Sequence, residues 1–551
     1  MRVVIRPGAS NGHAPLGKLD RMIRSQRLSR PSFCHCWVRE EMPPGEVEEE
    51  YWVNDCAVKI ISLGEGRRVY HIAPEEYRLP QREMVLLRDL IGRIPEHPPE
   101  HLGVDSEALR EHVLSLSRSF LEGGGDREES TDGVDRVRQL AEIAARHTVG
   151  LGMFELLLRD ERVEDVYIDS PPGRSPAHVT IHRGPDSLLK CTTNLTVTEE
   201  EVGGLISRLK QVSGRPFSEG YPTMETEVPG FDSRATLIGP PLSPSGVAVA
   251  IRRRNSRLWT LAKLLHNGTM DALTSALISL LIEGNSTVLI AGPRGVGKSS
   301  LLSAAMFEFP IDQRILTIED TRELPVFQMQ GLGYDIQSLL VQERIDGNRE
   351  REMDEALRVT LRMGETAIVL GEVRGREART LYQGMRTGRA GSAVMGTIHG
   401  SSAESVFKRV VHDIGISREA FSATDVIISL GIHRPMGTGK RSRKVVQVAE
   451  YRGDGSFKDL ISFDGQAWTP DLEGSRVLGE IARSWNVGLD EVLRDLRKRA
   501  ALKGALVRAE KIPGRLEPEW TIRSNGLYRS RGGEHGEELI HQVLGDPMES
   551  G

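Results

Sequence analysis

The pattern of hydrophobic and polar positions changes near residue 256 of the 551-residue chain. Before this point, short strand-like runs mix with helical stretches, as in α+β domains. After it, helices alternate with fully apolar strands, which predicts a parallel sheet wrapped by helices. The apolar strands are predicted at residues 287–291, 315–318, 367–370, 394–397 and 426–430. The predicted fold class is therefore α/β, preceded by α+β domains, with ligands expected at the carboxyl ends of the strands.

The first 133 residues are predicted to form a tail, a small domain and a linker. Residues 1–30 are rich in Arg, Gly, Ser and Pro without any period, which is typical of a flexible tail. Residues 31–121 read as a small α+β domain, with strands at 51–62 and 68–73 followed by two helices. Residues 122–133 are charged and glycine-rich and contain no apolar residue, so we predict a linker there.

Three further segments complete the predicted organisation. Residues 134–255 form a second α+β domain, which begins with a helix over 134–158 and ends in a hairpin of strands near 235–239 and 247–251. Residues 256–435 form the α/β core. Residues 436–551 form a C-terminal α+β extension, with strand-like runs and a charged helix at 487–499.

Charge and cysteine usage narrow the class of protein. A formal net charge of -6 gives no general attraction to nucleic acid or to anionic lipid. The sequence has no apolar stretch of about 18 residues and no secretory signal pattern, so we expect neither a membrane span nor export. Four cysteines argue against a disulfide framework. We therefore expect a cytoplasmic protein.

The segment from Gly292 to Ser299 matches the phosphate-binding pattern G-x-x-x-x-G-K-[ST] in full. It lies between a predicted strand and a predicted helix, which is the order that a phosphate-cradling loop requires. Lys298 would reach the β- and γ-phosphate oxygens of a nucleoside triphosphate, and Ser299 would bind Mg²⁺. The predicted nucleotide-binding residues of this loop are Gly292, Gly295, Gly297, Lys298, Ser299 and Ser300.

Polar groups also follow the next three apolar strands along the chain. Glu319, Asp320 and Glu323 come after the second strand, where they could orient water and balance the charge of Mg²⁺. Glu372 ends the third strand, from which an NTPase carboxylate reaches Mg²⁺ and the attacking water. His399 follows the fourth strand. Each feature alone has an ordinary explanation as a solvated turn or a structural side chain, but the four together and in this order favour a nucleotide site.

These four segments resemble, in order and spacing, the Walker A, aspartate box, Walker B and histidine box of the type II/IV secretion ATPase superfamily. The last three read IEDTRE at 318–323, GEVRGRE at 371–377 and GTIHG at 396–400. The superfamily contains the assembly motors of type IV pili, type II secretion and the archaeal flagellum. The resemblance covers about residues 258–435 and extends over residues 134–255. The amino-acid sequence near residues 363–375 is most similar to the archaeal branch that serves pilus-type filaments.

The resemblance implies a RecA-like P-loop core and a homo-hexameric ring that hydrolyses ATP with Mg²⁺. Such a motor acts on a polytopic platform protein at the cytoplasmic face of the cell membrane and indirectly on pilin-like subunits. Direct contact to nucleic acid is not expected, because the net charge is -6 and the sequence has no basic stripe interleaved with aromatic residues. By position, the implied catalytic residues are Glu372, Glu319, Glu323, His399 and Arg374, and the implied Mg²⁺ ligands are Ser299 and Glu372.

Members of the superfamily also use arginines of the preceding domain to complete the site. The candidates here are Arg234 and Arg252, the latter within an arginine run at 252–254. A guanidinium can stabilise the negative charge that spreads over a phosphoryl group in the transition state. A solvated hinge is the alternative explanation of the arginine run.

Two departures from the family pattern bear on metal binding and on function. A C-terminal four-cysteine zinc loop of some bacterial relatives is absent, because no cysteine follows Cys191. Cys34, Cys36 and Cys56 could offer thiolates to zinc, although buried, incidental cysteines are the simpler explanation. Residues 363–366 read MGET where flagellum motors usually carry an Arg-Pro-Asp run, which disfavours an archaeal flagellum motor. A nucleic-acid translocase and a non-hydrolysing nucleotide-binding scaffold stay open as competing functions.

Overall fold

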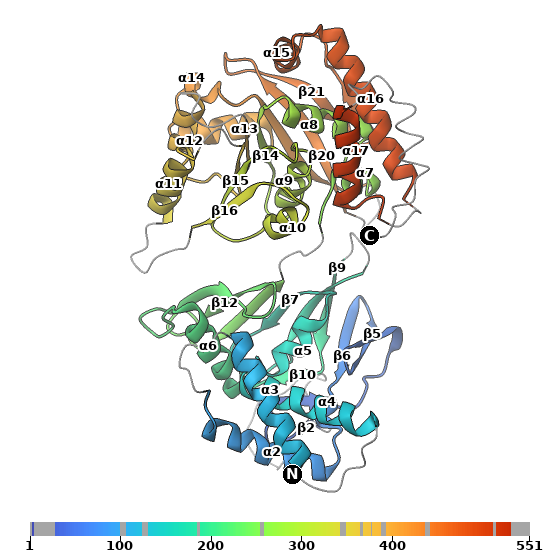
Figure 1. Cartoon of the computed structure of the whole chain (residues 1–551), viewed down its shortest axis with the longest axis vertical. Helices are drawn as coiled ribbons and strands as arrows, with labels where there is room; N and C mark the ends of the chain where they lie inside the picture. Colours follow the sequence, from blue (N-terminus) through green and yellow to red (C-terminus); the bar gives the residue numbers. More distant parts are fainter. Residues whose placement is uncertain are drawn as a thin grey trace. The chain divides into compact units, whose positions relative to one another are not determined.

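The chain folds into two compact units, Met1–Ser256 and Arg257–Gly551, which we call the N-terminal unit and the C-terminal unit (Figure 1). The computed structural model describes residues 3–4, 28–99, 106–123, 131–183, 188–253, 258–341, 349–363, 367–375, 377–386, 393–435, 441–510 and 514–530. Most of the predicted tail and residues 124–130 of the predicted linker lie outside these ranges.

The N-terminal unit consists of short strands and five longer helices in the part that the structure describes. Its strands are β1 (Val3–Val4), β2 (Leu28–Arg30), β3 (Cys36–Arg39), β4 (Glu46–Val53), β5 (Cys56–Gly64), β6 (Arg67–Ala73), β7 (Val163–Ile168), β8 (His178–His182), β9 (Leu188–Thr193), β10 (Leu195–Val197), β11 (Thr223–Glu227), β12 (Ser233–Ile238) and β13 (Ala248–Arg253). Its helices are α2 (Gln81–Arg93), α3 (Ser106–Gly123), α4 (Thr131–Thr148), α5 (Met153–Arg159) and α6 (Glu199–Ser213), with single turns η1 (Glu75–Tyr77) and η2 (Ile94–Glu96).

One nine-stranded sheet runs through this unit in the order β11-β12-β13-β7-β8-β9-β6-β5-β4. The parallel pair β6 and β9, in register at Val69 and Thr192, joins strands from both predicted α+β domains. A single hydrophobic core also contains residues of both, such as Ile60 of β5 and Val166 of β7. The structure therefore differs from the prediction of two separate domains at 31–121 and 134–255. Strand pairing across more than 100 residues leaves no local signal in the sequence.

The predicted helix over 134–158 is interrupted between α4 and α5. Gly152 adopts φ 58°, in the left-handed region that glycine tolerates best. A methyl group on Gly152 would lie 2.1 Å from Oε1 of Glu201, which accepts a hydrogen bond of 2.7 Å from the amide of Met153. The buried Glu201 carboxylate thus accepts a hydrogen bond from a backbone amide in the first turn of α5, and in this way it caps the helix.

The C-terminal unit is built on a second nine-stranded sheet, in the order β16-β15-β17-β18-β14-β19-β20-β21-β22. Its strands are β14 (Thr287–Ala291), β15 (Ile315–Glu319), β16 (Ile336–Leu340), β17 (Ala367–Leu370), β18 (Val394–Ile398), β19 (Val426–His433), β20 (Ser442–Tyr451), β21 (Phe457–Phe463) and β22 (Trp468–Pro470). Its helices are α7 (Leu261–His266), α8 (Ala272–Glu283), α9 (Lys298–Met306), α10 (Val326–Gly331), α11 (Arg349–Thr360), α12 (Glu377–Arg386), α13 (Ala403–Lys408), the π-helical turn η3 (Arg409–Asp413), α14 (Arg418–Phe421), α15 (Arg476–Ser484), α16 (Leu489–Arg508) and α17 (Pro518–Ser530).

The five predicted apolar strands are confirmed as β14, β15, β17, β18 and β19, and they are parallel wherever two of them are neighbours. Alternate residues of β14 enter two different cores: Val288 and Ile290 pack with α8, α9 and α16, while Leu289 and Ala291 pack with α11 to α14. Figure 1 shows these two helix groups on opposite sides of the sheet. The strands read as continuous apolar runs because both faces are covered.

The segment 436–551 does not stand apart from this sheet. β20 pairs antiparallel with β19, and β21 and β22 follow in order, so these strands extend the core sheet. α16 packs against α8 through residues such as Leu496 and Leu281 of the same core. The C-terminal extension predicted from the sequence is therefore an integral part of the α/β unit.

A buried ion pair links the C-terminal helices to the helix that follows the glycine loop. Lys503 of α16 donates from Nζ to both carboxylate oxygens of Glu308 at 2.7 Å, with side-chain exposures of 2% and 0%. Ser279 of α8 and Asn525 of α17 donate to the same carboxylate at 2.7 and 2.8 Å. Burial lowers the pKa of Lys503, an effect that the Glu308 charge opposes. Glu308 comes two residues after α9, so the pair fixes the far end of that helix.

Replacing Lys503 with Met is expected to lower the free energy of unfolding of the C-terminal unit by about 3–5 kcal/mol, because Glu308 would stay buried without a counter-charge. The double variant Lys503→Met/Glu308→Leu is expected to recover most of this loss. Heat or urea unfolding of the three proteins measures the effect. A single variant as stable as the wild type, or a double variant no better than the single one, would contradict it.

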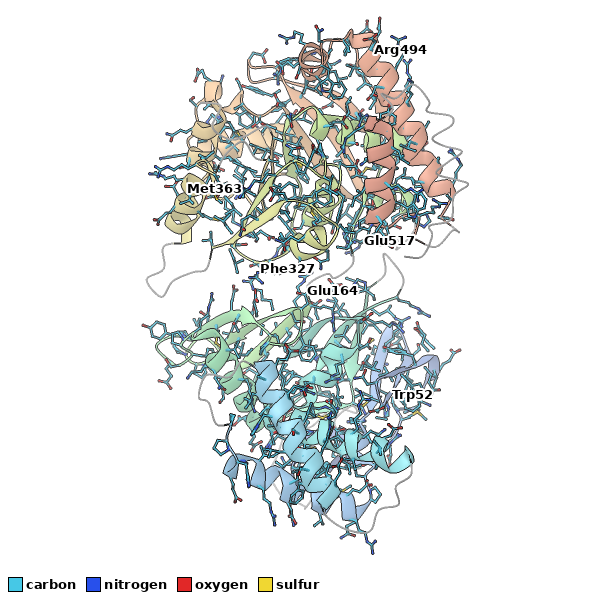
Figure 2. All side chains as sticks on the ribbon, viewed as in Figure 1. Trp52, Glu164, Phe327, Met363, Arg494 and Glu517 are labelled. Carbon is cyan, nitrogen blue, oxygen red and sulfur yellow. The ribbon has the colours of Figure 1, made fainter. Side chains whose placement is uncertain are left out.

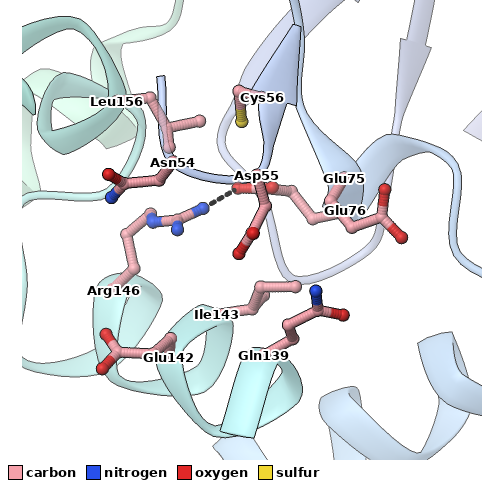
Figure 3. A pocket seen from close by; sticks show the side chains of 10 residues that line it. All are labelled: Asn54, Asp55, Cys56, Glu75, Glu76, Gln139, Glu142, Ile143, Arg146 and Leu156. Carbon is pink, nitrogen blue, oxygen red and sulfur yellow. Dashed lines mark hydrogen bonds and ion pairs between the residues drawn. The ribbon is translucent and has the colours of Figure 1, made fainter. Parts of the chain in front are cut away.

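A small cavity of the N-terminal unit lies beside the ion pair of Arg146 and Glu76 (Figure 3). It lies between the β4–β5 turn, η1 and α4, and its volume of about 20 Å³ has room for about one water molecule. A nucleotide needs a far larger site, on the order of 300 Å³ or more. This cavity is therefore not a nucleotide site.

The four cysteines are free and buried. Cys34, Cys36 and Cys56 belong to the core of the N-terminal unit, and burial raises the pKa of each thiol. Within the described ranges, no three His, Cys, Asp or Glu side chains are grouped so that they could hold a metal ion. The structure places these cysteines as apolar core residues.

The exposure of one aromatic side chain and the hydrophobicity of the helices are two further properties of the described residues. Trp52, near the end of edge strand β4, lies at the margin of the N-terminal unit (Figure 2) and is 68% exposed. An exposed aromatic side chain on an edge strand is typical of a contact surface. Separately, none of the described helices combines the length and the apolar character that crossing a membrane requires.

Candidate nucleotide-binding site

The topology of the C-terminal sheet gathers the four sequence motifs at one edge. β14, β18, β17 and β15 are neighbours and parallel, in that order, so the loops after them leave from the same carboxyl edge. β18 lies between β14, which leads into the glycine loop, and β17, which ends before Glu372. The insertion of one strand leaves space between the loop and the carboxylate.

The glycine loop has the backbone form that a phosphate cradle needs. Gly295 and Gly297 adopt φ 77° and 98°, which favour glycine strongly. A methyl group on Gly292 would lie 2.6 Å from Cγ1 of Val296 and 3.0 Å from the carbonyl oxygen of Leu430. α9 begins directly after Gly297 and has no side-chain cap, so its first amides are open to an anion.

Lys298 lies at the mouth of this loop and is 9% exposed. Its Nζ donates to the carbonyl oxygens of Gly292 and Pro293, both at 3.1 Å, and lies 3.4 Å from Nδ1 of His399. Burial lowers the pKa of Lys298, although the charges of Glu372 and Glu323 oppose the shift. The ammonium is therefore held by neutral carbonyls, which phosphate oxygens could replace.

Three side chains meet around Glu372. Arg374 Nη2 contacts Oε2 of Glu372, and Nε2 of His399 lies 3.2 Å from its Oε1. Burial raises the pKa of Glu372, but the hydrogen bond and charge of Arg374, with the charges of His399 and Lys298, outweigh it and lower the pKa overall. The pKa of His399 is lowered by burial and then by Lys298. These neighbours favour the ionised form of the Glu372 carboxylate.

The two acids of the aspartate box have different surroundings. Glu323 accepts a hydrogen bond of 2.6 Å from Oγ of Ser299, the hydroxyl that the sequence predicts as a Mg²⁺ ligand. Glu319 is 1% exposed, and its Oε1 accepts from the amides of Glu323 and Leu324 at 2.7 and 2.9 Å. Its Oε2 is buried without a hydrogen-bond partner among the described residues. Glu319 therefore positions Glu323.

Burial raises the pKa of Glu319 to about 7, although the two backbone hydrogen bonds lower it. Between pH 4.5 and 7 the folded chain then binds a proton that the unfolded chain has lost, so this group destabilises the fold as the pH rises. Above pH 7 this group lowers the free energy of unfolding by about 3 kcal/mol, because one pKa unit corresponds to about 1.4 kcal/mol. We expect the melting temperature of the nucleotide-free wild type to fall by several degrees relative to Glu319→Gln between pH 5 and 8. A constant difference would contradict this assignment.

Thr397, a residue that the predicted site did not include, links Walker B and the histidine box by hydrogen bonds. Thr397 Oγ1 donates to the carbonyl oxygen of Gly371 at 2.6 Å, and Val373 N donates to the carbonyl oxygen of Thr397 at 2.8 Å. These bonds fix the start of the turn that carries Glu372. The signal was present in the sequence, because Thr397 lies two residues before His399, but a threonine ending an apolar strand suggests no role by itself.

The predicted arginines of the preceding domain belong to the N-terminal unit. Arg234 of β12 and Arg252 of β13 are direct cross-strand neighbours. Arg234 contacts Glu225, and Arg252, with 68% of its side chain exposed, lies 3.3 Å from Glu164. Arg253 instead donates to backbone carbonyls of its own unit and is structural, while residue 254 lies outside the described residues.

The donors present fit a Mg²⁺ ion with a polyphosphate. Ser299 and Glu372 offer the hydroxyl and carboxylate oxygens that this ion prefers. Oε1 of Glu372 is buried and accepts no hydrogen bond from a described residue, with Nε2 of His399 3.2 Å away, so this oxygen could serve as a ligand. The open amides of α9 and the Lys298 ammonium supply the positive side of the site.

Residues 200–451 match a family model described as type II/IV secretion system protein. The uncharacterized protein MJ0781 of Methanocaldococcus jannaschii is 25% identical over 347 residues, which are 62% of this chain and 45% of that protein. The type IV secretion system protein PtlH of Bordetella pertussis is 26% identical over 234 residues, 39% of this chain and 68% of PtlH.

Among solved structures, the pilus retraction motor PilT with bound ADP matches 73% of this chain and 98% of its own chain, at 19% identity and a TM-score of 0.40. The chain spans about half the length of two archaeal relatives from M. jannaschii, 45% of one and 58% of the other.

Proposed function

We propose that this chain is a Mg²⁺-dependent ATPase that powers a filament or secretion apparatus, since its residues 200–451 match the model of the type II/IV secretion system protein family. One observation carries the proposal: at one sheet edge, His399 contacts both Lys298 and Glu372, while Ser299, next to Lys298, donates to Glu323. Family membership alone gives no chemistry, because function depends on the site that the fold carries.

The site residues have different roles in the proposed hydrolysis of ATP. Lys298 and the amides at the start of α9 hold the β- and γ-phosphates. Oε1 of Glu372, the carboxylate oxygen that Arg374 does not contact, orients the attacking water and accepts its proton. Ser299 and Glu372 would hold Mg²⁺, which when bound would offset the charge of the phosphate oxygens. The Ser299 hydroxyl that would serve as a ligand donates to Glu323 in this structure.

Arg374 and His399 control the charge of Glu372. Arg374 contacts Glu372 and lies 3.8 Å from Asp320, so it spans the Walker B turn and the aspartate box. His399 contacts Lys298 on one ring nitrogen and Glu372 on the other. A phosphate that replaces the loop carbonyls as the partner of Lys298 therefore changes the surroundings of Glu372 through His399, which contacts both residues.

For the apparatus itself we propose a homo-hexamer acting on a membrane platform protein from the cytoplasmic face. PtlH, by its name a type IV secretion system protein, supports a secretion or pilus-type role. A nucleic-acid translocase is the alternative, and the net charge of -6 disfavours it.

ATP turnover of the full chain with and without DNA, beside its mass with and without nucleotide, separates these roles. A particle near six subunits whose rate ignores DNA would support the filament or secretion motor. A several-fold rise of the rate with DNA would move the assignment to the translocase, and binding of ATP without turnover would favour the scaffold.

A further inference from the structure

The strand pair β19 and β20 extends beyond the sheet edge that carries the nucleotide site. β14 ends at Ala291, which pairs with Ser429 of β19, but β19 continues to His433. The four extra residues pair with Ser442 to Val445 of β20, after a bulge between Ser429 and Leu430. This extension, residues 430–433 and 442–445, projects past the carboxyl edge where the glycine loop begins.

The extension lies along the glycine loop at both ends of the loop. At the first glycine, a methyl group on Gly292 would be 3.0 Å from the carbonyl oxygen of Leu430. At the last, a methyl group on Gly297 would be 3.6 Å from Cδ of Arg443. Two separate close approaches therefore fix β19 and β20 as one wall of the loop.

One face of this wall changes from apolar to cationic as it leaves the core. Leu430 and Val445 are cross-strand partners, are buried, and belong to the same core as Val296 of the loop. The next pair on the same face is Ile432 and Arg443. Ile432 is 45% exposed and Arg443 is also exposed, so this pair faces solvent beside the phosphate cradle.

Arg443 forms no hydrogen bond and no ion pair with any residue that the structure describes, although it lies beside the glycine loop. Its neighbour Lys444 points to the other face, where it donates to the carbonyl oxygen of Gly268 and lies 5.2 Å from the ring of Trp468. The central carbon of the Arg443 guanidinium is two bonds beyond Cδ, which would be in van der Waals contact with a methyl group on Gly297. A cation without a partner beside an anion cradle is suited to bind the anion.

Resting on the proposed function, we infer that Arg443 is a nucleotide-binding residue of the same subunit, which binds the α- and β-phosphates. Loop amides of this type cradle the α- and β-phosphates, while the loop lysine reaches the β- and γ-phosphates. Arg443 adjoins Gly297 of the loop, on the β19 side of β14, and Glu372 follows β17 on the other side. It therefore contacts the part of the nucleotide that ATP and ADP share, with Ile432 beside it against the sugar and base.

The test compares Arg443→Gln with Arg443→Lys and with the control Arg452→Gln, all in the full chain with Mg²⁺. Arg452 is exposed just beyond the opposite end of β20, so it undergoes the same change of charge far from the loop. Titration calorimetry with ADP and with a non-hydrolysable ATP analogue measures affinity. The rise of the melting temperature with ADP gives an independent readout.

Arg443→Gln is expected to weaken the binding of ADP and of the ATP analogue by a similar factor, about tenfold or more. Arg443→Lys is expected to fall between it and the wild type, because an ammonium keeps the charge but not the bidentate geometry. In turnover, KM rises more than kcat falls, since ground state and transition state lose the same contact.

Two results would overturn the inference while leaving the proposed function intact: affinities of Arg443→Gln equal to those of Arg452→Gln, or a loss confined to the ATP analogue, which would place Arg443 at the γ-phosphate. A wild-type chain that binds neither nucleotide would instead refute the proposed function, on which the inference rests.

Discussion

Replacing Lys298 with Ala is expected to lower ATP turnover by about 10²–10³-fold and to weaken nucleotide binding, because the loop loses the ammonium that meets the β- and γ-phosphates. The structure shows why no rearrangement compensates. Nζ of Lys298 is held between two loop carbonyls, and removing it leaves these carbonyls facing the phosphate. Phosphate release and a titration with ADP measure both effects.

Lys498→Ala is the matched control for this prediction. It removes the same charge from the exposed face of α16 in the same unit, and its turnover should equal that of the wild type. Folding is not at risk at Lys298, since its bonds are to carbonyls of a surface loop, so melting temperatures without nucleotide should agree within a few degrees. Equal turnover in Lys298→Ala and Lys498→Ala would remove the glycine loop from the mechanism.

Replacing Glu372 with Gln is expected to lower kcat by about 10²–10⁴-fold while ATP binding is kept. The amide retains the size of the carboxylate but cannot accept the proton of the attacking water. The lowered pKa of Glu372 means that the wild-type group is ionised at neutral pH and ready to accept it. Single-turnover kinetics with ATP, beside a binding titration, separate the two effects.

Glu404→Gln, in the exposed first turn of α13, makes the same change away from the site and should leave kcat unchanged. Loss of ATP binding together with kcat in Glu372→Gln would assign Glu372 to binding alone. An unchanged kcat would exclude it as the group that activates water.

The sequence predicted the C-terminal unit better than the N-terminal one, for a physical reason. Buried parallel strands are continuous apolar runs, so β14, β15, β17, β18 and β19 could be located from composition alone. Their order in the sheet, and the addition of β20 to β22 to it, depend on pairings between distant segments. The joining of β6 to β9 is of the same kind, which is why one N-terminal sheet was predicted as two domains.

The sequence predicted which motifs form the candidate site, but it did not predict the burial or the hydrogen-bond partners of their side chains. The sequence placed Glu319 and Glu323 together as acids of one box, and the structure separates them by burial and by the partners of each. Arg443 had no motif to mark it, since a basic residue in a charged run is usually solvated. Only the register of β19 and β20 brings it to the loop. The family match confirms the resemblance, while the roles of single residues stay predictions.

The most direct measurement of the central claim is phosphate release from ATP by the purified wild-type chain with Mg²⁺, with Lys298→Ala and Glu372→Gln in the same assay. The account predicts steady turnover by the wild type that both substitutions remove, with nucleotide binding kept in Glu372→Gln alone. Equal rates in all three proteins, or a wild type that binds ATP and never releases phosphate, would contradict it.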